Sequence, residues 1–404
     1  MSSVRIARIA DFCTTGTGGT PSRDKFDRYY DGGTIPWVKS GELREETIYG
    51  TEERITELAL KETNVKRVPP GALLLAMYGA TVGRLATLGV EATTNQAVCH
   101  IIPDPTQGDV RYLFHALRSQ VASIIGKGVG GAQPNISQGI VKHIKVPLPP
   151  LAEQRRIADI LDRVDSLRAM RRAAIDQLET LSQSIFFDMF GDPATNSKAW
   201  PTSRLGEICT VDSPLVDPRR EEYRHFLHYG PDRIQRDTGE LLPAKTAVED
   251  GLISAKFLFD ENAILYSKIR PNLNKVALAE ARGLCSADVY PVNVKPEKLA
   301  REFLWCLLRG AHFLSYTAEV SNRANIPKIN REQFLKYVAV CPPITLQTEF
   351  AQKIRKVRQL KTSHRASLVE LEALFASYQQ EAFDEHKSQQ RSSPNLHHRH
   401  AGAA

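Results

Sequence analysis

Hydrophobic residues between Leu151 and Phe190 recur at alternating spacings of three and four. They fall at Ile157, Ile160, Val164, Leu167, Ala174, Leu178, Leu181 and Ile185. This pattern predicts an α-helix with a narrow apolar seam that packs against a partner helix. Pro149-Pro150 before the segment and Gly191-Asp192-Pro193 after it are typical of a helix start and stop. A helix of this length spans roughly 60 Å at about 1.5 Å per residue, which suits a spacer better than the core of one domain.

A second copy of this pattern lies 193 residues further along the chain, where Pro342-Pro343 match Pro149-Pro150. The predicted seam positions match between the two copies: Ile157 with Phe350, Val164 with Val357, Leu167 with Leu360, Leu178 with Leu371 and Leu181 with Leu374. Because the period is so long, each repeat comprises a whole domain followed by a helix. The sequence therefore predicts two long helices, within 147–192 and 341–384, that pack on each other as spacers.

Arg171 interrupts the first apolar seam, and His364 stands at the matching position of the second. Two helices related by a pseudo-two-fold axis run antiparallel, and their midpoints then face each other. We therefore expect Arg171 and His364 to meet in a polar layer, with His364 neutral and accepting a hydrogen bond, or with an acid between them. Alternatively, the Arg171 side chain extends outward along the edge of the seam.

The rest of the chain divides into two segments, 1–146 and 193–340, that share a frame. In the first, strands are predicted at Ile35–Val38, Ala72–Met77 and Arg84–Leu88, and a helix at Val110–Ile125. The second repeats this frame, since residues 261–279 resemble 70–88. The predicted fold class is α+β, with two pseudo-symmetric domains joined by two long antiparallel coiled-coil helices and a disordered tail at 385–404.

The loops of the two domains differ although their frames agree. The first domain carries TGGTPS and GGTIPWV, whereas the second carries YRHFLHYGPDRIQRDTGELLPAK. A shared frame with dissimilar loops is expected of two modules that recognise different things. Duplication followed by drift of loops without function would leave the same pattern.

Composition and charge narrow the class of protein. The 404 residues are 42% hydrophobic and carry a net charge of +7 with a pI near 9.0, which permits a polyanionic partner without requiring one. No apolar run reaches membrane-spanning length and the first residues lack an apolar signal, so we expect a cytoplasmic protein. The six cysteines are scattered without a CxxC pair, which favours reduced thiols over a zinc site.

Catalytic motifs are missing from the sequence. Each Pro-Pro pair follows Val, Leu or Cys, so the Asn/Asp-Pro-Pro-aromatic loop of an amino-methyltransferase is absent. Gly126-Lys127-Gly128 lacks the Ser or Thr that follows the lysine of a P-loop. No Ser/His/Asp or Cys/His grouping stands out. The chain is therefore predicted not to be an enzyme, with no catalytic, cofactor-binding or metal-ligating residues.

Several segments together resemble one known family. TGGTPS, Ile35–Val38, PPGALLLAMYGATVGRLATL, TNQA, QPNIS and PLPPLAEQRRIADILD are similar to segments of the specificity subunits of type I restriction-modification systems. The resemblance implies two target-recognition domains held apart by two long helices and binding of a bipartite DNA sequence. It also implies two modification (methyltransferase) subunits as partners, with S-adenosylmethionine bound to those partners and not to this chain, and restriction subunits. The second copy departs from the motif, with CPPITLQ in place of PLPPLAEQ, which leaves open how symmetrically the helices contact their partners.

Candidate DNA-binding residues are polar or cationic side chains in the loops, because phosphate contacts provide affinity and base-edge contacts provide specificity. In the first domain they are Thr20, Ser22, Arg23, Lys39, Tyr78, Arg84, Asn95, Gln96, Gln133 and Asn135. In the second domain they are Arg233, Arg236, Lys245, Lys268, Arg270, Asn272, Asn274, Lys275, Arg323 and Asn325. For each of them, a solvated charge or a turn residue is the alternative interpretation.

Two other functions fit parts of this pattern. One is a recognition subunit of a different modular restriction-methylation system, which would need the same reading role with other enzyme chains. The other is a coiled-coil scaffold that binds no nucleic acid. Salt-dependent DNA binding would separate a DNA reader from a scaffold.

Overall fold

The computed structural model describes residues 4–44, 47–126, 135–321 and 327–383. The chain forms two compact units, residues 1–170 with 368–404 and residues 171–367. Two helices of 40 residues contribute to both units: α6 (Leu151–Phe190) and α11 (Ile344–Phe383). The bounds predicted for the first long helix are thus confirmed.

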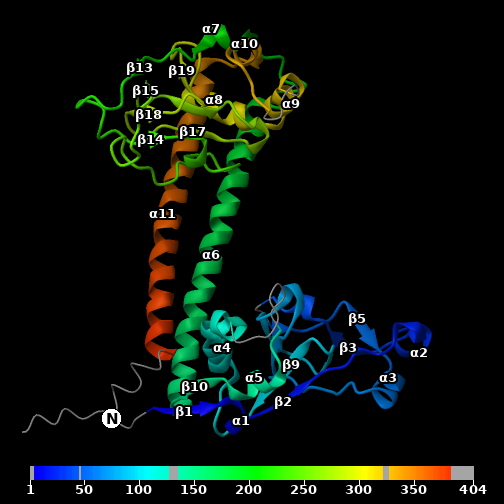
Figure 1. Cartoon of the computed structure of the whole chain (residues 1–404). Helices are drawn as coiled ribbons and strands as arrows, with labels where there is room; N and C mark the ends of the chain where they lie inside the picture. The colour runs from blue at the N-terminus through cyan, green and yellow to red at the C-terminus, as the bar shows by residue number, and fades with distance from the viewer. Residues whose placement is uncertain (1–3, 45–46, 127–134, 322–326, 384–404) are drawn as a thin grey trace, which may run out of the picture. The chain divides into compact units, whose positions relative to one another are not determined.

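The first unit is built on a five-stranded sheet in the order β2-β9-β6-β7-β4, beside a three-stranded sheet β5-β3-β8 and the pair β1-β10. Helix α4 (Val110–Gly126) contacts β6 and β7 and, in Figure 1, lies beside the first half of α6. The strands are β1 Arg5–Arg8, β2 Cys13–Thr17, β3 Ile35–Val38, β4 Thr47–Ile48, β5 Glu53–Ile55, β6 Leu73–Ala76, β7 Leu85–Leu88, β8 Thr93–Thr94, β9 Val98–Pro103 and β10 Lys145–Leu148. The short helices are α1 Ile9–Phe12, α2 Phe26–Tyr29, α3 Glu57–Glu62 and α5 Gln138–His143, with 3-10 turns η1 Arg23–Lys25, η2 Ser40–Glu42 and η3 Gly79–Thr81.

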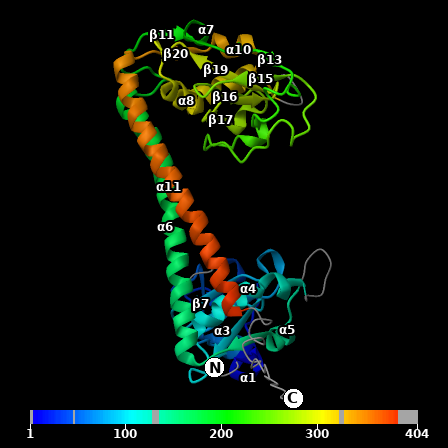
Figure 2. The same ribbon diagram turned by 90° about the vertical axis from the view of Figure 1, so that its left-hand side faces the viewer.

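The second unit repeats this plan with two four-stranded sheets, β12-β19-β16-β17 and β13-β15-β18-β14, and the pair β11-β20. Figure 2 shows α8 (Arg301–Arg309) beside the first of these sheets. The strands are β11 Thr202–Arg204, β12 Cys209–Thr210, β13 Leu215–Val216, β14 His228–Tyr229, β15 Lys256–Phe259, β16 Ile264–Ser267, β17 Val276–Leu278, β18 Gly283–Cys285, β19 Val289–Val294 and β20 Val338–Val340. The other helices are α7 Leu205–Ile208, α9 Ala311–Val320 and α10 Arg331–Lys336, with 3-10 turns η4 Pro231–Arg233 and η5 Pro271–Leu273.

The internal repeat is confirmed in the central strands and in the long helices. Strand β16 begins 191 positions after β6 (Leu73 to Ile264), and β19 follows β9 at the same offset (Val98 to Val289). The offset is 193 for α11 relative to α6 (Leu151 to Ile344). Both units therefore carry a sheet and its helix on a common frame, followed by a long helix.

Each unit buries one stretch of both long helices in its core. In the first unit, Leu161 and Val164 of α6 share a core with Leu371 and Phe375 of α11. The first half of α6 thus packs on the last turns of α11, so the two helices run antiparallel there. The core also includes Tyr112 of α4, whose ring lies 5.3 Å from that of Phe383.

In the second unit, the last half of α6 packs on the first half of α11. Phe186 and Phe190 of α6 contact Phe350 of α11 and Phe303 of α8, with ring centroids 4.7–5.7 Å apart. Aromatic pairs at these distances contribute energy beyond the area that they bury. An antiparallel helix pair therefore also anchors the sheet-bearing helix in this unit.

Candidate nucleic-acid interface

The first unit brings several predicted DNA-binding residues to one edge of its sheets. Strand β3 runs parallel to β8, so Lys39 and Asn95, which follow these strands, emerge at the same end. The backbone N–H of Asn95 donates to the carbonyl oxygen of Val38 over 2.9 Å. The Asn95 side chain accepts from the N–H of Ala97 over 3.1 Å, which shapes the loop between β8 and β9.

The same loop joins this edge to the end of β6. The N–H of Met77 donates to the carbonyl of Ala97 over 2.8 Å, and the N–H of Ile136 donates to the carbonyl of Met77 over 2.7 Å. Tyr78, Gln96 and Asn135, each adjacent to one of these backbone groups, therefore lie close together. Burial raises the pKa of the Tyr78 hydroxyl although it hydrogen-bonds to Gln96, so Tyr78 stays a neutral hydrogen-bonding group.

The glycine-rich turn of the first unit lies against this edge. The N–H of Gly19 donates to the carbonyl of Thr94 over 3.0 Å. A Cβ at Gly18 would lie 1.9 Å from the same carbonyl oxygen, so only glycine permits this approach. The turn holds the exposed side chains of Thr20 and Ser22 next to the β8–β9 loop.

Arg23 and Lys39 are neutralised by the same carboxylate. Glu53 Oε2 lies 2.6 Å from Arg23, and Glu53 Oε1 accepts from Lys39 Nζ over 2.9 Å. The hydrogen bonds to Glu53 and then to Glu52 raise the pKa of Lys39. The Arg23 guanidinium also lies 4.2 Å from the centroid of the Tyr30 ring. These two cations therefore shape the edge, whereas Arg84, before β7, is an exposed side chain.

The second unit builds its edge with the same backbone pairings. The N–H of Lys268 donates to the carbonyl of Asp288 and the N–H of Ile329 to the carbonyl of Lys268, both over 3.0 Å. Arg270 adopts a left-handed backbone with φ of 47° at the start of the turn Pro271–Leu273. This turn presents the exposed side chains of Arg270 and Asn272.

A long loop unique to the second unit lies against this turn. Lys275 Nζ donates to the carbonyl of Pro231 over 2.6 Å, and Arg233 Nη1 donates to the carbonyl of Pro243 over 2.7 Å. Both cations thus hold the loop in place. Arg236 and Lys245 are exposed in the same loop, with Arg236 Nε 2.8 Å from Asp237.

Not every predicted residue faces solvent. Asn274 is 8% exposed, and its Nδ2 donates to the carbonyl of Arg309 over 3.2 Å, so it supports the turn and does not fit a DNA contact. The Lys268 side chain is 15% exposed, and burial together with Lys328 lowers its pKa. Gln133, Arg323 and Asn325 lie outside the described residues.

Lys328 is an exposed cation of this edge that the sequence analysis missed. Lys328 forms an isolated antiparallel β-bridge with Ile269. It stands 193 residues after Asn135, the offset of the repeat. The repeat itself could have identified it, because Asn135 was a candidate.

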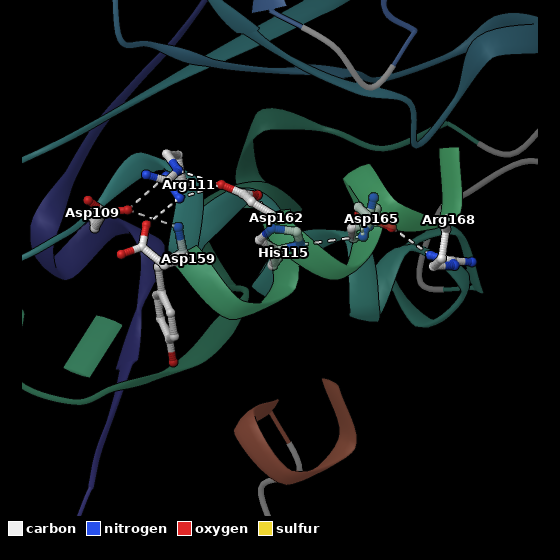
Figure 3. A network of polar contacts seen from close by, with 9 residues as sticks. Asp109, Arg111, His115, Asp159, Asp162, Asp165 and Arg168 are labelled. Atoms are coloured by element: carbon white, nitrogen blue, oxygen red, sulfur yellow. Dashed lines mark hydrogen bonds and ion pairs between the residues drawn. The ribbon is translucent and has the colours of Figure 1, made fainter. Parts of the chain in front are cut away.

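A row of polar contacts joins α4 to α6 in the first unit (Figure 3). Arg111 donates to Asp159 over 2.7 Å and to Asp162 over 2.5 Å, and His115 Nε2 lies 2.6 Å from Asp162. Burial raises the pKa of Asp162, but the hydrogen bonds from His115 and Arg111 outweigh it and leave the pKa below its ordinary value. Asp165 continues the row, since it pairs with Arg118 of α4 and also accepts from Arg168 of α6 over 2.6 Å. The row fixes how the sheet-bearing helix lies on the long helix.

The long helices meet at the predicted polar position. Arg171 Nη1 lies 3.1 Å from Nδ1 of His364 in the second unit. Because a guanidinium only donates, Nδ1 of His364 is the acceptor and carries no proton. The expected polar contact between these two residues is therefore present.

The apolar seam differs from its prediction at four leucines. Leu167, Leu181, Leu360 and Leu374 were expected in the seam, but they are 43%, 43%, 51% and 43% exposed. Other predicted seam residues are less exposed: Val164, Val357 and Phe350 are buried, and Ile157, Leu178 and Leu371 are half-buried. The buried line instead passes through polar positions such as Ser182 and Lys361. Their polar groups are paired, Ser182 to the carbonyl of Leu178 and Lys361 to Glu179, so burial at these positions is permitted.

Within the described ranges, no three His, Cys, Asp or Glu side chains are grouped as a metal ion would require. No helix among the same residues is long and apolar enough to span a membrane.

Comparison with known proteins extends across both units. The family model of the type I restriction modification DNA specificity domain matches residues 1–180 and 197–373. The chain is 29% identical over 291 residues to the EcoDI specificity subunit of Escherichia coli, which covers 64% of each protein. The chain thus spans just under two thirds of that relative. It is 31% identical over 335 residues to the MjaIX specificity subunit of Methanocaldococcus jannaschii, covering 75% of each.

Solved structures show the same fold. The S subunit of a type I restriction-modification system from M. genitalium superposes with a TM-score of 0.64 at 14% identity, covering 95% of this chain and 97% of that one. A chain from a study of complex assembly in the type I R-M system gives a TM-score of 0.51 at 17% identity, covering 94% and 97%. Because the family model matches both halves of the repeat, the chain belongs to the family of type I restriction-modification DNA specificity subunits.

Proposed function

We propose that this chain is the DNA-reading subunit of a type I restriction-modification complex and reads a bipartite target, one half-site with each unit. The observation that carries the proposal is that each unit gathers predicted DNA-binding residues at one edge of its sheets. Both edges are built by the same backbone pairings. The edge of the first unit offers mainly hydroxyl and amide groups, whereas the edge of the second unit offers mainly cations. Amides and arginines are the side chains that read base edges bidentately. The dissimilar chemistry supports two different half-sites.

The exposed and partly exposed candidates divide into two roles. Tyr78, Gln96 and Asn135 are neutral hydrogen-bonding groups and suit base edges. Arg84, Arg270 and Lys328 are exposed cations and suit phosphates. The net charge of +7 favours association with DNA at low salt.

We infer that catalysis resides on partner subunits, two modification subunits carrying S-adenosylmethionine and the restriction subunits, in the cytoplasm where they meet DNA. The four exposed leucines support a duplicated docking surface on the long helices. Leu167 matches Leu360 and Leu181 matches Leu374 through the repeat. Replacing Leu167 and Leu360 with Asp should lower the number of bound modification subunits, measured by native mass spectrometry, without changing the fold.

The test of DNA reading is salt-dependent binding by the purified chain together with its modification subunits. Arg270→Ala should weaken binding several-fold and reduce the slope of log affinity against log salt by about 1, as loss of one phosphate contact does. Lys336→Ala is the matched control, because Lys336 is exposed and already paired with Glu332 at 2.6 Å on α10. Mapping of methylated adenines in the host genome would give the target. Absence of salt-dependent DNA binding by the complex would favour the scaffold interpretation.

A further inference from the structure

Two fully buried glutamines occupy the same place in the first turn of the two long helices. Gln154 of α6 and Gln347 of α11 are both 0% exposed, although glutamine is usually a surface residue. The residues lie 193 positions apart, the offset of the helices themselves.

The Gln154 amide uses both of its donor hydrogens and one lone pair of its oxygen within the first unit. Its Oε1 accepts from the backbone N–H of Asp109 over 2.9 Å. Its Nε2 donates to the carbonyl oxygens of Gln107 and Pro149, each over 2.8 Å. One side chain thus joins the segment before α4 to the segment before α6.

Gln347 repeats these contacts with the same atoms in the second unit. Its Oε1 accepts from the N–H of Ala300 over 2.9 Å, and its Nε2 donates to the carbonyls of Lys298 and Pro342 over 3.2 and 2.8 Å. Here the amide joins the segment before α8 to the segment before α11.

Both joints hold the start of the helix that carries the recognition sheet. The Asp109 carboxylate accepts hydrogen bonds from the backbone N–H groups of Arg111 and Tyr112 over 3.0 and 3.1 Å, so Asp109 caps α4. Ala300 is the N-cap residue of α8. α4 contacts β6 and β7, and α8 contacts β17 and β19. A shift at either joint therefore moves a whole recognition sheet relative to its long helix.

The charged contacts next to the joints have diverged, whereas the joints have not. Arg111 of α4 pairs with Asp162 of α6 in the first unit. At the matching positions of the second unit, Glu302 of α8 pairs with Arg355 of α11 at 3.2 Å, so the two charges have changed places. The two units therefore differ in the polarity of the ion pair between the sheet-bearing helix and the long helix. Both units nevertheless retain a glutamine whose amide donates two hydrogen bonds and accepts one.

We propose that Gln154 and Gln347 are positioning residues that set the angle between each recognition sheet and its long helix, and so the gap length accepted between the two half-sites. The proposal rests on the proposed function. A carboxylate at either position would face two carbonyl oxygens without a proton to donate, and a methionine would fill the space but make none of the three hydrogen bonds.

The test measures methylation by the full chain co-expressed with its modification subunits. A plasmid library carries the mapped target with the native gap and with gaps one and two base pairs shorter or longer. The variants are Gln154→Met, Gln347→Met and Gln154→Glu, and the control is Gln352→Glu, an exposed glutamine on α11. The melting temperature of each complex is recorded beside the methylation.

We expect the ratio of methylation at the native gap to that at neighbouring gaps to fall at least fivefold in the variants, with unchanged half-site sequences and an unchanged ratio in the control. A ratio within twofold of wild type overturns the proposal. Equal loss of methylation at every gap, including loss through misfolding, also overturns it, because the glutamines would then serve stability alone. Wild-type complex that methylates no bipartite target would refute the proposed function instead.

Discussion

Glu179 neutralises two cations that are almost fully buried in the second unit. Its Oε1 lies 2.5 Å from Arg309 and its Oε2 contacts Lys361, and the two cationic side chains are only 8% and 6% exposed. Burial raises the pKa of Glu179, but Arg309 and Lys361 outweigh it and bring the pKa below its usual 4.5. The stabilisation is therefore present at neutral pH and lost as the pH falls through the folded-state pKa.

We expect Glu179→Gln to lower the free energy of unfolding by roughly 3 kcal/mol at pH 7, because the buried Arg309 loses the carboxylate that it pairs with and the buried Lys361 loses one of its two, keeping Glu240. The difference from wild type should start to shrink as the pH falls below 4.5 and should be lost below the lower folded-state pKa, where the wild-type carboxyl is neutral as well. Denaturant unfolding at several pH values measures both effects. The control is Glu349→Gln, an exposed residue paired with Lys353, which should cost less than about 0.5 kcal/mol. Equal costs for the two variants would show that the buried pairing is not stabilising.

The polar contact between Arg171 and His364 should reduce stability while fixing the alignment of the helices. Replacing both by Leu is expected to raise the free energy of unfolding by about 1 kcal/mol, since apolar pairs in a helix seam are usually at least as stable as polar ones. Thermal unfolding of the double variant measures this. An unchanged melting temperature would indicate that neither side chain lies in the seam.

At the residue scale, a contact between positions that the repeat makes equivalent could be predicted from the sequence. The Arg171–His364 contact follows from an offset and an antiparallel arrangement. The exposure of Leu181 and Leu360 could not be predicted, because the buried line runs through the adjacent Ser182 and Lys361, whose partners come from the helix backbone and from the other long helix. A count of apolar residues cannot reveal that a polar residue is paired.

At the scale of elements, the exchanged ion pairs between a sheet-bearing helix and its long helix allow a direct test. Glu302→Arg and Arg355→Glu should each destabilise the second unit by about 2 kcal/mol, because the Glu302 side chain is 7% exposed and each change places like charges together. The double variant reproduces the polarity of Arg111 and Asp162 and should recover at least 1 kcal/mol. Urea unfolding of the four chains gives the coupling energy.

A matched control for this cycle is the exposed pair of Glu332 and Lys336 on α10, 2.6 Å apart. Exchanging those two charges should give a coupling below about 0.5 kcal/mol. Additive effects of the Glu302 and Arg355 changes would mean that the exchanged pair does not hold α8 on α11.

Elements with strong local signals were predictable, and elements fixed by distant partners were not. The bounds of α6 agree with the sequence because proline and glycine mark its ends. The predicted helix Val110–Ile125 differs from α4 by one residue. Two-residue strands such as β8 and β14 exist only through pairing with β3 and β18, which no local pattern reveals. The edges of the two units depend on the same long-range pairings.

At the scale of the whole molecule, the two units should specify their half-sites independently. Replacing residues 194–340 with the matching segment of a relative should change one half of the methylated motif only. Within the exchanged segment, Glu240 pairs with Lys361 and Arg309 pairs with Glu179, and both partners lie outside the segment. Glu240 and Arg309 should therefore be kept in the exchanged chain. Methylation mapping by long-read sequencing gives the result. A change in both half-sites would contradict independent reading.

Helix length should set the distance between the half-sites. Inserting one heptad after Ala174 adds about 10 Å at about 1.5 Å per residue, which corresponds to about three base-pair steps of 3.4 Å. A matched heptad after Ser367, the equivalent position in α11, keeps the two helices in register. We therefore expect a methylated motif with unchanged half-sites and a gap longer by about three base pairs.

The insertion lengthens the helix pair without rotating its contact face, whereas a longer gap also rotates one half-site relative to the other. A heptad leaves the contact face of a helix pair nearly unchanged, whereas three base pairs rotate DNA by about 100° at about 10.5 base pairs per turn. The complex must absorb this rotation by twisting DNA or the helices, so binding at the new gap should be weaker than wild-type binding at the native gap. An insertion in α11 alone is the control, because it displaces the helices from register and should abolish methylation. Methylation at the original gap by the doubly extended chain would show that the long helices do not set the spacing.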